Sequence, residues 1–506
     1  MEKITILGLL RKYEEWVKKG QIQFLEKGSE KQKNILNLVN KLISDFKSAT
    51  EKPGDFSENL NWYKTHQNGR DLWQKLASCA LNSIDKESQG NSKLFEFLDA
   101  ATDFEELLYG LEPYYRDHTL HSLWVYFIGE HLLRDLMPEI HKDLNWYLYN
   151  DIELDKSMSP SLVKDSRKKE RELCKKINEY RDAIWCLIAL CHDLGYSLAK
   201  LDKLNEKVED VLKFFELPDF RRIGYSLDIE HQYNVTQFLE LMAMEVRIVP
   251  GRDNKKEVLI KCYRDDPTYW LLCRALEKKQ HGILSSYLIY KMLGLFGDTS
   301  IRGAAEEWGL DDDEAVGNVI YGDILYAIAQ HEFDFAYVYE LNSLADILII
   351  SDELEEFSRY GREMLSREYH DTIAESRISI SPKMPKQTDG IEIDILYEVE
   401  KHQDLNPFFE RKAERLCKIY SLKQSQDEGK FCSIKRIKIT ATQESEKLAF
   451  HLCRDTKNKV YLPKMKFRDK TYKQGEYDLN FRDDKLYVGI KDNEISLKEW
   501  FENVVR

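Results

Sequence analysis

Apolar residues recur at helical spacing over most of the first 375 positions. Ile35, Val39, Ile43 and Phe46, for example, lie three or four residues apart, which is the spacing along one face of an α-helix. The same pattern is strong from about residue 104 to residue 365. We therefore predict a mainly α protein, with an N-terminal helical region at residues 1–100 and a larger helical domain at residues 101–375.

Three segments of this helical part have other patterns. Residues 151–176 are dense in Lys, Asp and Glu and have little periodicity before Leu173, so we interpret them as a surface insertion between two helices. Residues 250–258 have the composition of a turn. The run Asp311–Glu314 is acidic, and negative charge is favoured in the first turn of a helix, so we expect a helix to begin there.

The pattern changes after about residue 376. Residues 381–390 have the composition of a linker, and Ile391–Val399 alternates apolar and polar residues as a half-buried strand does. Residues 376–506 therefore form a predicted C-terminal α+β domain of sufficient size for its own small core. The further elements expected in it are a helix at residues 407–422, strands at 433–442, 459–462 and 485–490, and a closing helix at 497–504.

Composition and charge narrow the functional classes. The chain has 506 residues, of which 42% are hydrophobic, and a net charge of −14, so it is neither mostly disordered nor suited to nonspecific binding of DNA over its whole surface. The longest uninterrupted apolar run, Ala183–Cys191, is far short of the ~20 residues of a membrane-spanning helix. Nine cysteines without a CxxC pair and an N-terminus without a secretory signal indicate a reducing cytoplasm.

Histidines and aspartates occur repeatedly on apolar faces of the predicted helices. His121 is followed at helical spacing by Val125, Ile128 and Leu132, so it lies on the apolar stripe. A buried imidazole or carboxylate needs a partner, and several of them satisfy one another when they share metal ions. The other residues placed in this way are His192, Asp193, His281, His331 and Asp352.

Each of these residues also has a simpler interpretation. A single histidine on an apolar helix face is most often a core residue that is bonded to a backbone carbonyl, and a buried aspartate is most often a helix cap. The joint occurrence of four histidines and two aspartates favours a metal site. Three rival ligands stay open: His118 for His121, His231 for His281, and Asp346, which the polar neighbours Asn342 and Ser343 make less buried, for Asp352.

The order of these residues resembles the HD superfamily of metal-dependent phosphohydrolases. That family is named for an H…HD…D pattern on an all-helical bundle, and its two-metal members add two histidines before the last aspartate. The segments HSLWV, CHDLGY and SDELEEF resemble its motifs, over roughly residues 104–365. The resemblance implies a helical HD-type bundle with one or two divalent transition metals (Mn, Fe, Zn, Co or Ni). Their ligands would be His121, His192, Asp193, Asp352, His281 and His331, with Asp193 as the bridge.

One departure from the family pattern concerns catalysis. Many hydrolytic members have a lysine three residues after the HD aspartate, where this chain has Tyr196. Lys200 lies one helical turn further on and can replace it, and Arg116 is a second candidate for phosphate contact. We therefore expect Asp193, Lys200 and Arg116 to be the catalytic residues.

The resemblance implies hydrolysis of a phosphoester or phosphoanhydride by metal-activated water, with a nucleotide or another small phosphorylated metabolite as substrate. The chain has neither a Walker loop nor a GxGxxG motif, so a P-loop motor and a dinucleotide oxidoreductase lack support. One alternative is a nuclease for single-stranded nucleic acid that binds through the basic, aromatic stretch Lys457–Lys473. Another is a noncatalytic ligand sensor or scaffold.

The C-terminal domain is expected to act apart from the metal site. None of the six proposed ligands lies beyond Asp352. We therefore expect this domain to govern assembly, including homo-oligomer formation, or substrate choice rather than bond cleavage. A chain that ends near Ile380 should then retain the metal site, because interfaces between domains of one chain are often polar enough to be separated.

Overall fold

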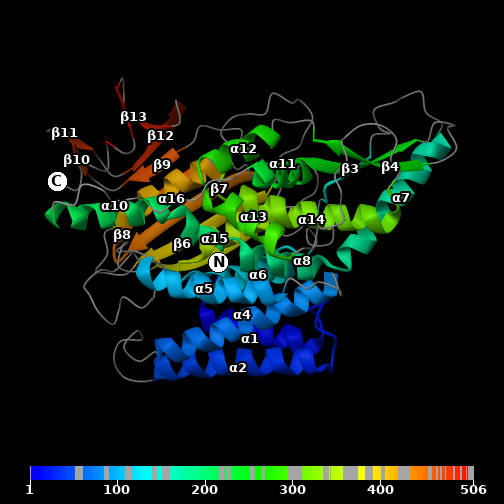
Figure 1. The fold of residues 1–506 in the computed structure, drawn as a ribbon. Helices are drawn as coiled ribbons and strands as arrows, with labels where there is room; N and C mark the ends of the chain where they lie inside the picture. Colours follow the sequence, from blue (N-terminus) through cyan, green and yellow to red (C-terminus); the bar gives the residue numbers. More distant parts are fainter. Residues whose placement is uncertain are drawn as a thin grey trace.

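The computed structural model shows a mainly helical protein with a large sheet near the C-terminus, as predicted (Figure 1). It describes residues 2–51, 61–84, 91–108, 117–138, 144, 146–150, 160–215, 222, 224, 229–250, 257–264, 268–293, 310–333, 341, 343–356, 374–381, 391–399, 405–419, 434–453, 459–462, 465–467, 470–472, 475–482, 485–490, 493–496 and 499. All structural statements below refer to these residues.

The N-terminal helices share a core with the central ones. Tyr13 and Tyr126 join hydroxyl to hydroxyl at 3.1 Å, and the indole N–H of Trp73 donates to the carbonyl of Leu190 at 3.0 Å. One continuous apolar cluster runs through both regions. The N-terminal helices are α1 (Ile6–Lys19), α2 (Glu30–Glu51), α4 (Trp62–Ile84) and α5 (Asn91–Leu108).

The central helices include several that are buried on all sides. The sequence of α8, RDAIWCLIALC, is apolar around almost its whole circumference, so this helix lies in the core rather than on the surface. The central elements are α6 (His118–His131), η1 (Leu132–Leu136), α7 (Pro160–Asn178), α8 (Arg181–Cys191), α9 (Tyr196–Ala199), α10 (Leu201–Leu212), η4 (Lys213–Phe215), α11 (Ile229–Met242), α12 (Thr268–Glu277), α13 (His281–Leu293), α14 (Asp312–Gln330) and α15 (Leu344–Leu354).

Two features of the central region were not predicted: a helix within the expected surface insertion, and a strand pair on either side of the expected turn at residues 250–258. Residues 160–176 belong to helix α7, which buries only Ser166, Leu173 and Ile177, so its weak periodicity reflects a narrow apolar stripe. Residues 244–263 contain an antiparallel pair, β3 (Met244–Pro250) and β4 (Glu257–Tyr263), and β2 (Leu148–Asn150) adds to β3 in parallel. By contrast, the expected helix start at Asp311 is confirmed, because Asp311 and Glu314 form a capping box at the start of α14.

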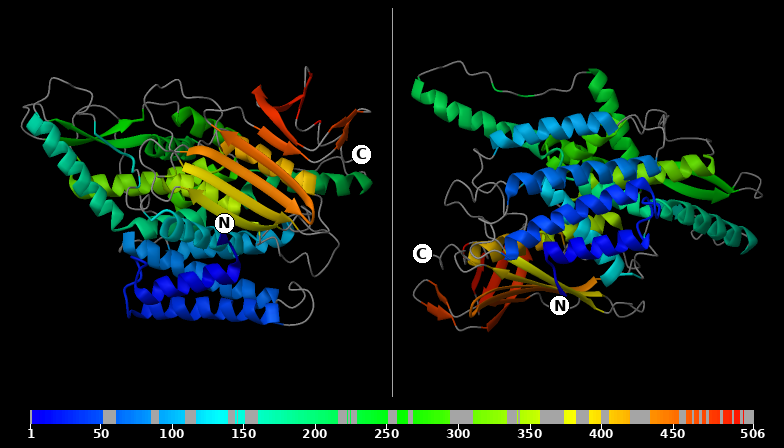
Figure 2. Two further views of the ribbon diagram at one scale, coloured as in Figure 1. Left: turned by 180° about the vertical axis from the view of Figure 1, so that it is seen from behind. Right: turned by 90° about the horizontal axis from the view of Figure 1, so that it is seen from below.

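The C-terminal region contains a nine-stranded sheet, which includes the N-terminal strand β1 (Glu2–Lys3), and a separate two-stranded sheet of β10 and β11. Strand β1 pairs with β5 at one edge of the nine-stranded sheet and β14 forms the opposite edge, so both ends of the described chain belong to one sheet (Figure 2). The predicted strand at Ile391–Val399 is confirmed as β6, and every second residue of it is buried. The strands of this region are β5 (Ala374–Ser381), β6 (Ile391–Val399), β7 (Ile434–Gln443), β8 (Glu446–Cys453), β9 (Lys459–Leu462), β10 (Met465–Phe467), β11 (Lys470–Tyr472), β12 (Gly475–Arg482), β13 (Lys485–Ile490) and β14 (Asn493–Ser496).

Helix α16 (Leu405–Ile419) connects the parallel strands β6 and β7. Its apolar face buries Phe408, Phe409 and Leu416, and Phe408 packs edge to face on Tyr397 of β6. The hydroxyl of Tyr397 donates to the carbonyl of Glu353 at 2.8 Å, so this face of the sheet meets the helical bundle. The predicted closing helix at 497–504 lies almost entirely outside the described residues.

One stretch of the described chain, Arg181–Leu212, is long and apolar enough by composition to cross a membrane. It begins with α8, and 67% of its apolar window is buried inside the protein. This burial is consistent with a soluble protein.

Close packing of α6 on α8 allows a test of this core. A Cβ atom at Gly129 would overlap the ring of Trp185, whereas one at Gly317 would approach only Tyr321, at 3.8 Å. We expect Gly129→Ala to lower the free energy of unfolding by about 1–3 kcal/mol through overpacking. Gly317→Ala, the matched control in α14, should raise it by up to about 1 kcal/mol, because alanine is the better helix former. Urea unfolding followed by circular dichroism measures both, and equal effects would contradict the packing described.

Candidate metal centre

The predicted ligands lie at the ends of five helices. His121 is one turn into α6, which the side chain of Asp117 caps, and His281 is the first residue of α13. His192 and His331 are the C-terminal caps of α8 and α14, with Asp193 directly after the first of them. Asp352 lies in the last turn of α15. Helix ends allow adjacent side chains such as His192 and Asp193 to reach one site.

Asp193 is the centre of the group. Its Oδ2 lies 3.4 Å from Nε2 of His121 and 3.5 Å from Nε2 of His192. Its Oδ1 lies 3.1 Å from Nε2 of His281 and 3.6 Å from Nε2 of His331. Asp352 Oδ1 is 3.0 Å from Nε2 of His121. The structure therefore brings together all six predicted ligands, with one carboxylate oxygen of Asp193 facing each pair of histidines.

Two sets of three residues could each hold a metal ion. The first is His121, His192 and Asp193, and the second is Asp193, His281 and His331. Within each set the candidate ligand atoms lie within 4.8 Å of one another. Since Asp193 belongs to both sets, the arrangement could hold either one metal ion or a bridged pair.

The Nδ1 atoms of the two helix-capping histidines point away from this centre. His192 Nδ1 is 2.8 Å from the carbonyl of Ala189, and His331 Nδ1 is 2.6 Å from the carbonyl of Ile328. Both carbonyls lie in the last turn of a helix, where carbonyls lack partners within the helix. A carbonyl only accepts, so Nδ1 must be the donor. In the neutral ring this leaves the lone pair on Nε2, which faces the centre.

The other two histidines, His121 and His281, also hydrogen-bond through Nδ1, but their partners are carboxylates. His121 Nδ1 is 2.7 Å from Oε2 of Glu355, and His281 Nδ1 is 2.8 Å from Oε2 of Glu332. Glu355 is fully buried. A hydrogen bond from the outer nitrogen to a carboxylate or a carbonyl is the usual support of a histidine that binds metal, because it fixes both the tautomer and the orientation of the ring.

The donor set fits a divalent transition metal. The Nε2 atoms of His121 and His192 are 3.3 Å apart, and those of His281 and His331 are 3.1 Å apart. Ligands that each bind one ion at about 2.1 Å lie roughly 3.0–3.4 Å apart, so these spacings suit shared coordination. Two facing lone pairs repel each other unless a cation lies between them. Imidazole nitrogens with carboxylate oxygens suit Zn, Fe, Mn, Co or Ni.

The electrostatics favour the ligand forms of two of these residues. Burial lowers the pKa of His192 to about 3, which keeps its ring neutral. Burial alone would raise the pKa of Asp193, but the surrounding imidazoles of His192, His281 and His331 hold it well below its usual range. Burial also lowers the pKa of His281, yet Glu332 and Asp193 outweigh burial and raise it to about 9. Without metal, a proton on His281 therefore neutralises part of the negative charge of Asp193 and Glu332.

Two glycines allow the helices to approach closely enough for this arrangement. A Cβ atom at Gly195 would overlap the backbone nitrogen of Ser285 and lie 2.7 Å from the carbonyl oxygen of His281. A Cβ atom at Gly282 would lie 2.9 Å from the carbonyl oxygen of Ile328. The glycine of CHDLGY thus brings α13, and with it His281, against Asp193.

The rival ligands have other positions. The ring of His118 packs on Tyr196, with centroids 4.0 Å apart, and His118 belongs to neither metal set. Asp346 lies in the first turn of α15 and is only 6% exposed, so the expectation that it is less buried was wrong. The reason is that α15 is buried almost throughout, whatever its flanking residues. The side chain of His231 lies outside the described residues.

Of the two predicted catalytic residues besides Asp193, the structure describes only Lys200. Lys200 caps α9, and its Nζ lies 4.5 Å from the ring centroid of Tyr196. The Tyr196 ring in turn lies 5.4 Å from that of His281, so Lys200 is connected to the centre through Tyr196. Arg116 lies outside the described residues.

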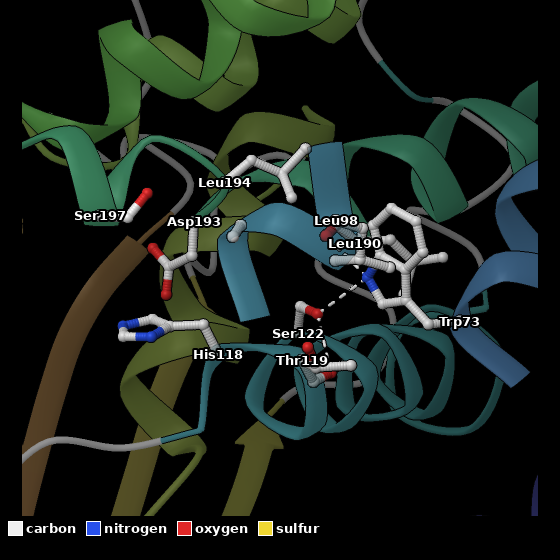
Figure 3. A pocket seen from close by; sticks show the side chains of 10 residues that line it. Trp73, Leu98, His118, Thr119, Ser122, Leu190, Asp193, Leu194 and Ser197 are labelled. Atoms are coloured by element: carbon white, nitrogen blue, oxygen red, sulfur yellow. Dashed lines mark hydrogen bonds between the residues drawn. The ribbon is translucent and has the colours of Figure 1, made fainter. Parts of the chain in front are cut away.

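A cavity opens beside Asp193 (Figure 3). At one end His118, Asp193 and Ser197 lie together, and at the other end the wall consists of Trp73, Leu98 and other apolar side chains. Trp73 belongs to α4 and Leu98 to α5, so the N-terminal helices, in which the sequence shows no chemistry, form part of the wall. The remaining residues of the lining are Ala101, Thr119, Ser122, Leu190 and Leu194.

Sequence reasoning missed Glu332 and Glu355. Each is close in sequence to a predicted ligand, since Glu332 follows His331 and Glu355 lies three residues after Asp352. That proximity was the only available signal. Glu332 supports His281, which is 51 positions away, and Glu355 supports His121, which is 234 positions away. Such partners are set by the packing of helices and not by local spacing.

Comparisons with models of protein families, with curated proteins and with solved structures find no match to this chain. The relation to the HD superfamily therefore rests on the ordered motif residues alone.

Metal content tests the centre directly. We expect the purified protein to hold one or two transition-metal ions per chain, and Asp193→Asn to lose most of this metal, because each set loses its shared carboxylate. His118→Ala, a buried histidine outside both sets, is the matched control and should retain the metal. Elemental analysis of folded protein measures both. Loss of metal from His118→Ala with retention in Asp193→Asn would transfer the ligand role to His118.

The support from Glu355 gives a second prediction. Glu355→Gln keeps an acceptor for His121 Nδ1 but removes its charge, so the ring becomes a weaker ligand. We expect metal affinity to fall by about 10-fold or more, as for other partners of metal-binding histidines. Competition with a chelator measures the affinity. Glu398→Gln, which removes a half-exposed carboxylate of the sheet, should leave it unchanged. Equal affinities for the Glu355 variant and the unmodified protein would sink the assigned role.

Proposed function

We propose that this protein is an HD-type metal-dependent phosphohydrolase of the cytoplasm. Its substrate is a nucleotide or another small phosphorylated metabolite, in which it cleaves a phosphoester or phosphoanhydride bond. The ordered residues His121, His192-Asp193, His281, His331 and Asp352 support the family relation. The helical setting and the convergence of these side chains support the metal centre.

The observation that carries the proposal is the position of Asp193 between two pairs of histidines. A carboxylate with each oxygen facing a separate nitrogen pair suits two neighbouring cations. Divalent metals held there would activate water for attack and neutralise negative charge on phosphoryl oxygens. Phosphoester hydrolysis needs both of these contributions, because charge on the phosphoryl oxygens must be stabilised during in-line attack.

The protein's own residues supply orientation and charge around this centre. Glu355 and Glu332 fix the rings of His121 and His281, so their Nε2 atoms stay directed inward. His118 lines the cavity beside Asp193, where an imidazole is in a position to donate a proton to the departing oxygen. The half-buried Lys200 contributes a positive charge against the ring of Tyr196, which itself packs on His118 and His281, and this charge attracts a phosphorylated substrate.

The lining of the cavity beside Asp193 is polar at one end and apolar at the other. Its polar end at Asp193 suits a phosphoryl group, and its apolar end at Trp73 and Leu98 suits a compact apolar or heterocyclic group. Strands β9, β10 and β11 run through the basic stretch that favours the nuclease alternative, but most of its side chains lie outside the described part of the chain. Within it, Lys459 forms an ion pair with Glu476 at 3.2 Å, so its charge is already partly balanced.

Turnover by the full chain with added Mn²⁺ or Co²⁺ tests the function. We expect phosphate release from nucleotides or small phosphoesters and none from single-stranded oligonucleotides. Lys200→Ala should raise KM more than it lowers kcat, because the positive charge of this residue contributes to binding of the substrate. Lys203→Ala, which removes an exposed lysine of the neighbouring helix α10, is the control and should leave both constants unchanged.

Other outcomes of the screen distinguish the alternatives. Cleavage of oligonucleotides alone would replace the proposal with the nuclease. Inactivity of metal-loaded protein toward every phosphorylated compound, together with tight binding of one of them, would favour the sensor or scaffold.

A further inference from the structure

Two basic side chains of the C-terminal domain reach the metal-bearing end of α15. Both come from α16, which lies between sheet and bundle, and both point at the segment that follows Asp352. Lys412 Nζ donates to the carbonyl of Glu353 at 2.9 Å and pairs with the carboxylate of Glu356. Arg415 Nε donates to Oε1 of Glu353 at 2.6 Å.

Strand residues add to this attachment. The hydroxyl of Tyr397 in β6 donates to the same carbonyl of Glu353, and the hydroxyl of Ser376 in β5 donates to the carbonyl of Leu354 at 2.9 Å. The residues just after Asp352 are thus held by three elements of the C-terminal domain. Carbonyls at the end of a helix lack partners within the helix, so these donors determine where α15 ends and where its last side chains point.

The attached segment makes two of the contacts of the metal centre. Asp352 approaches Nε2 of His121 at 3.0 Å, and Glu355 accepts from Nδ1 of the same ring at 2.7 Å. Asp352 and Glu355 immediately flank Glu353 and Leu354, which the C-terminal domain binds. A shift of this segment would therefore move both the ligand and the support of His121.

Arg415 also contacts the other half of the centre. Its Nη2 donates to the carbonyl of His331 at 2.8 Å. One guanidinium thus joins the backbone of a ligand on α14 to the side chain of Glu353 after α15. Because its planar fork binds in two directions at once, a lysine cannot reproduce both bonds.

Lys412 is buried and Arg415 is partly buried, with 24% of its side chain exposed, so the contacts of both cations are constrained. Lys412 is only 8% exposed, and its ammonium lies between Glu353, Glu356 and the ring of Tyr397. Removing one partner of a buried ion pair leaves the other charge uncompensated, so the group must stay in this position or reorganise. The attachment is therefore a rigid link and not a mobile surface contact.

We propose that Arg415 and Lys412 are positioning residues of the metal centre, and that the docked C-terminal domain sets its affinity for metal. This inference rests on the metal centre of the proposed function but not on the substrate. It replaces the expectation that a chain ending near Ile380 retains the site, because such a chain would lack Lys412, Arg415 and Tyr397. Metal binding at the centre thereby depends on the docking of the C-terminal domain on the helical bundle.

Cobalt titration of the full-length protein tests the proposal. Co²⁺ gives a visible absorption spectrum that reports coordination, and it needs no knowledge of the substrate. We expect Arg415→Ala to weaken Co²⁺ binding by about 10-fold or more, and to alter the spectrum, as removal of outer partners of metal ligands does. Lys412→Met should act in the same direction. Circular dichroism and thermal unfolding establish that each variant is folded at the temperature used.

A matched control separates positioning from general damage to the sheet. Arg436 pairs with Glu392 and Asp394 within the sheet, so Arg436→Ala removes a half-buried arginine of the same domain without touching the centre. It should bind Co²⁺ as the unmodified protein does. If Arg436→Ala and Arg415→Ala weaken binding equally, the effect is general loss of the sheet and the proposal is overturned.

Further variants keep the test decisive. Arg415→Lys retains charge and bulk, and we expect intermediate affinity because only one of the two bonds can form. Glu353→Gln combined with Arg415→Ala should cost less than the sum of the single effects, since the two residues act through one contact. Affinity of folded Arg415→Lys or Arg415→Ala equal to that of the unmodified protein would overturn the positioning role. Failure of the unmodified protein to bind Co²⁺ would instead overturn the metal centre itself.

Discussion

The site depends on one buried carboxylate. Asp193 is only 7% exposed and yet held in its charged form, which is costly unless positive or hydrogen-bonding groups surround it. Four imidazoles approach it, two at each oxygen. The rings of these imidazoles are in turn fixed from outside by two carbonyls and two glutamates. Much of the central packing, including the close contacts at Gly195 and Gly282, places these groups around a single charge.

The coarse fold and the ligand set could be predicted from the sequence because both are expressed in local spacing. A histidine that shares its helix face with Val125, Ile128 and Leu132 must be buried, whatever the rest of the chain does. Strand β6 was predictable for the same reason, since alternate residues of Ile391–Val399 are apolar. The narrow stripe of α7 and the strand pair β3–β4 were missed, because charged flanks and a turn-like composition obscured the periodicity.

The supports of the site could not be predicted, because they join residues that are distant in the chain. Glu355 meets His121 only after α15 packs beside α6, and Arg415 reaches His331 only after α16 docks on the bundle. Burial of Asp346 was misjudged for a related reason, since its exposure depends on what covers α15 and not on its polar neighbours. The candidate ligands are thus indicated by local spacing in this chain, whereas the orientation of their side chains is a property of its tertiary structure.

Tyr196 shows how one substitution redistributes charge around the site. It occupies the position at which many hydrolases of the HD superfamily, which the motifs of this chain resemble, have a lysine, and its ring contacts those of His118 and His281. The nearest lysine along the chain is Lys200, and its ammonium lies over the ring of Tyr196, 4.5 Å from the ring centroid. A cation over an aromatic face is attracted by the electrons of the ring, so this contact holds the charge of Lys200 against Tyr196. In this chain the positive charge therefore lies one helical turn further along, against Tyr196, whereas the groups nearest to Asp193 are imidazoles.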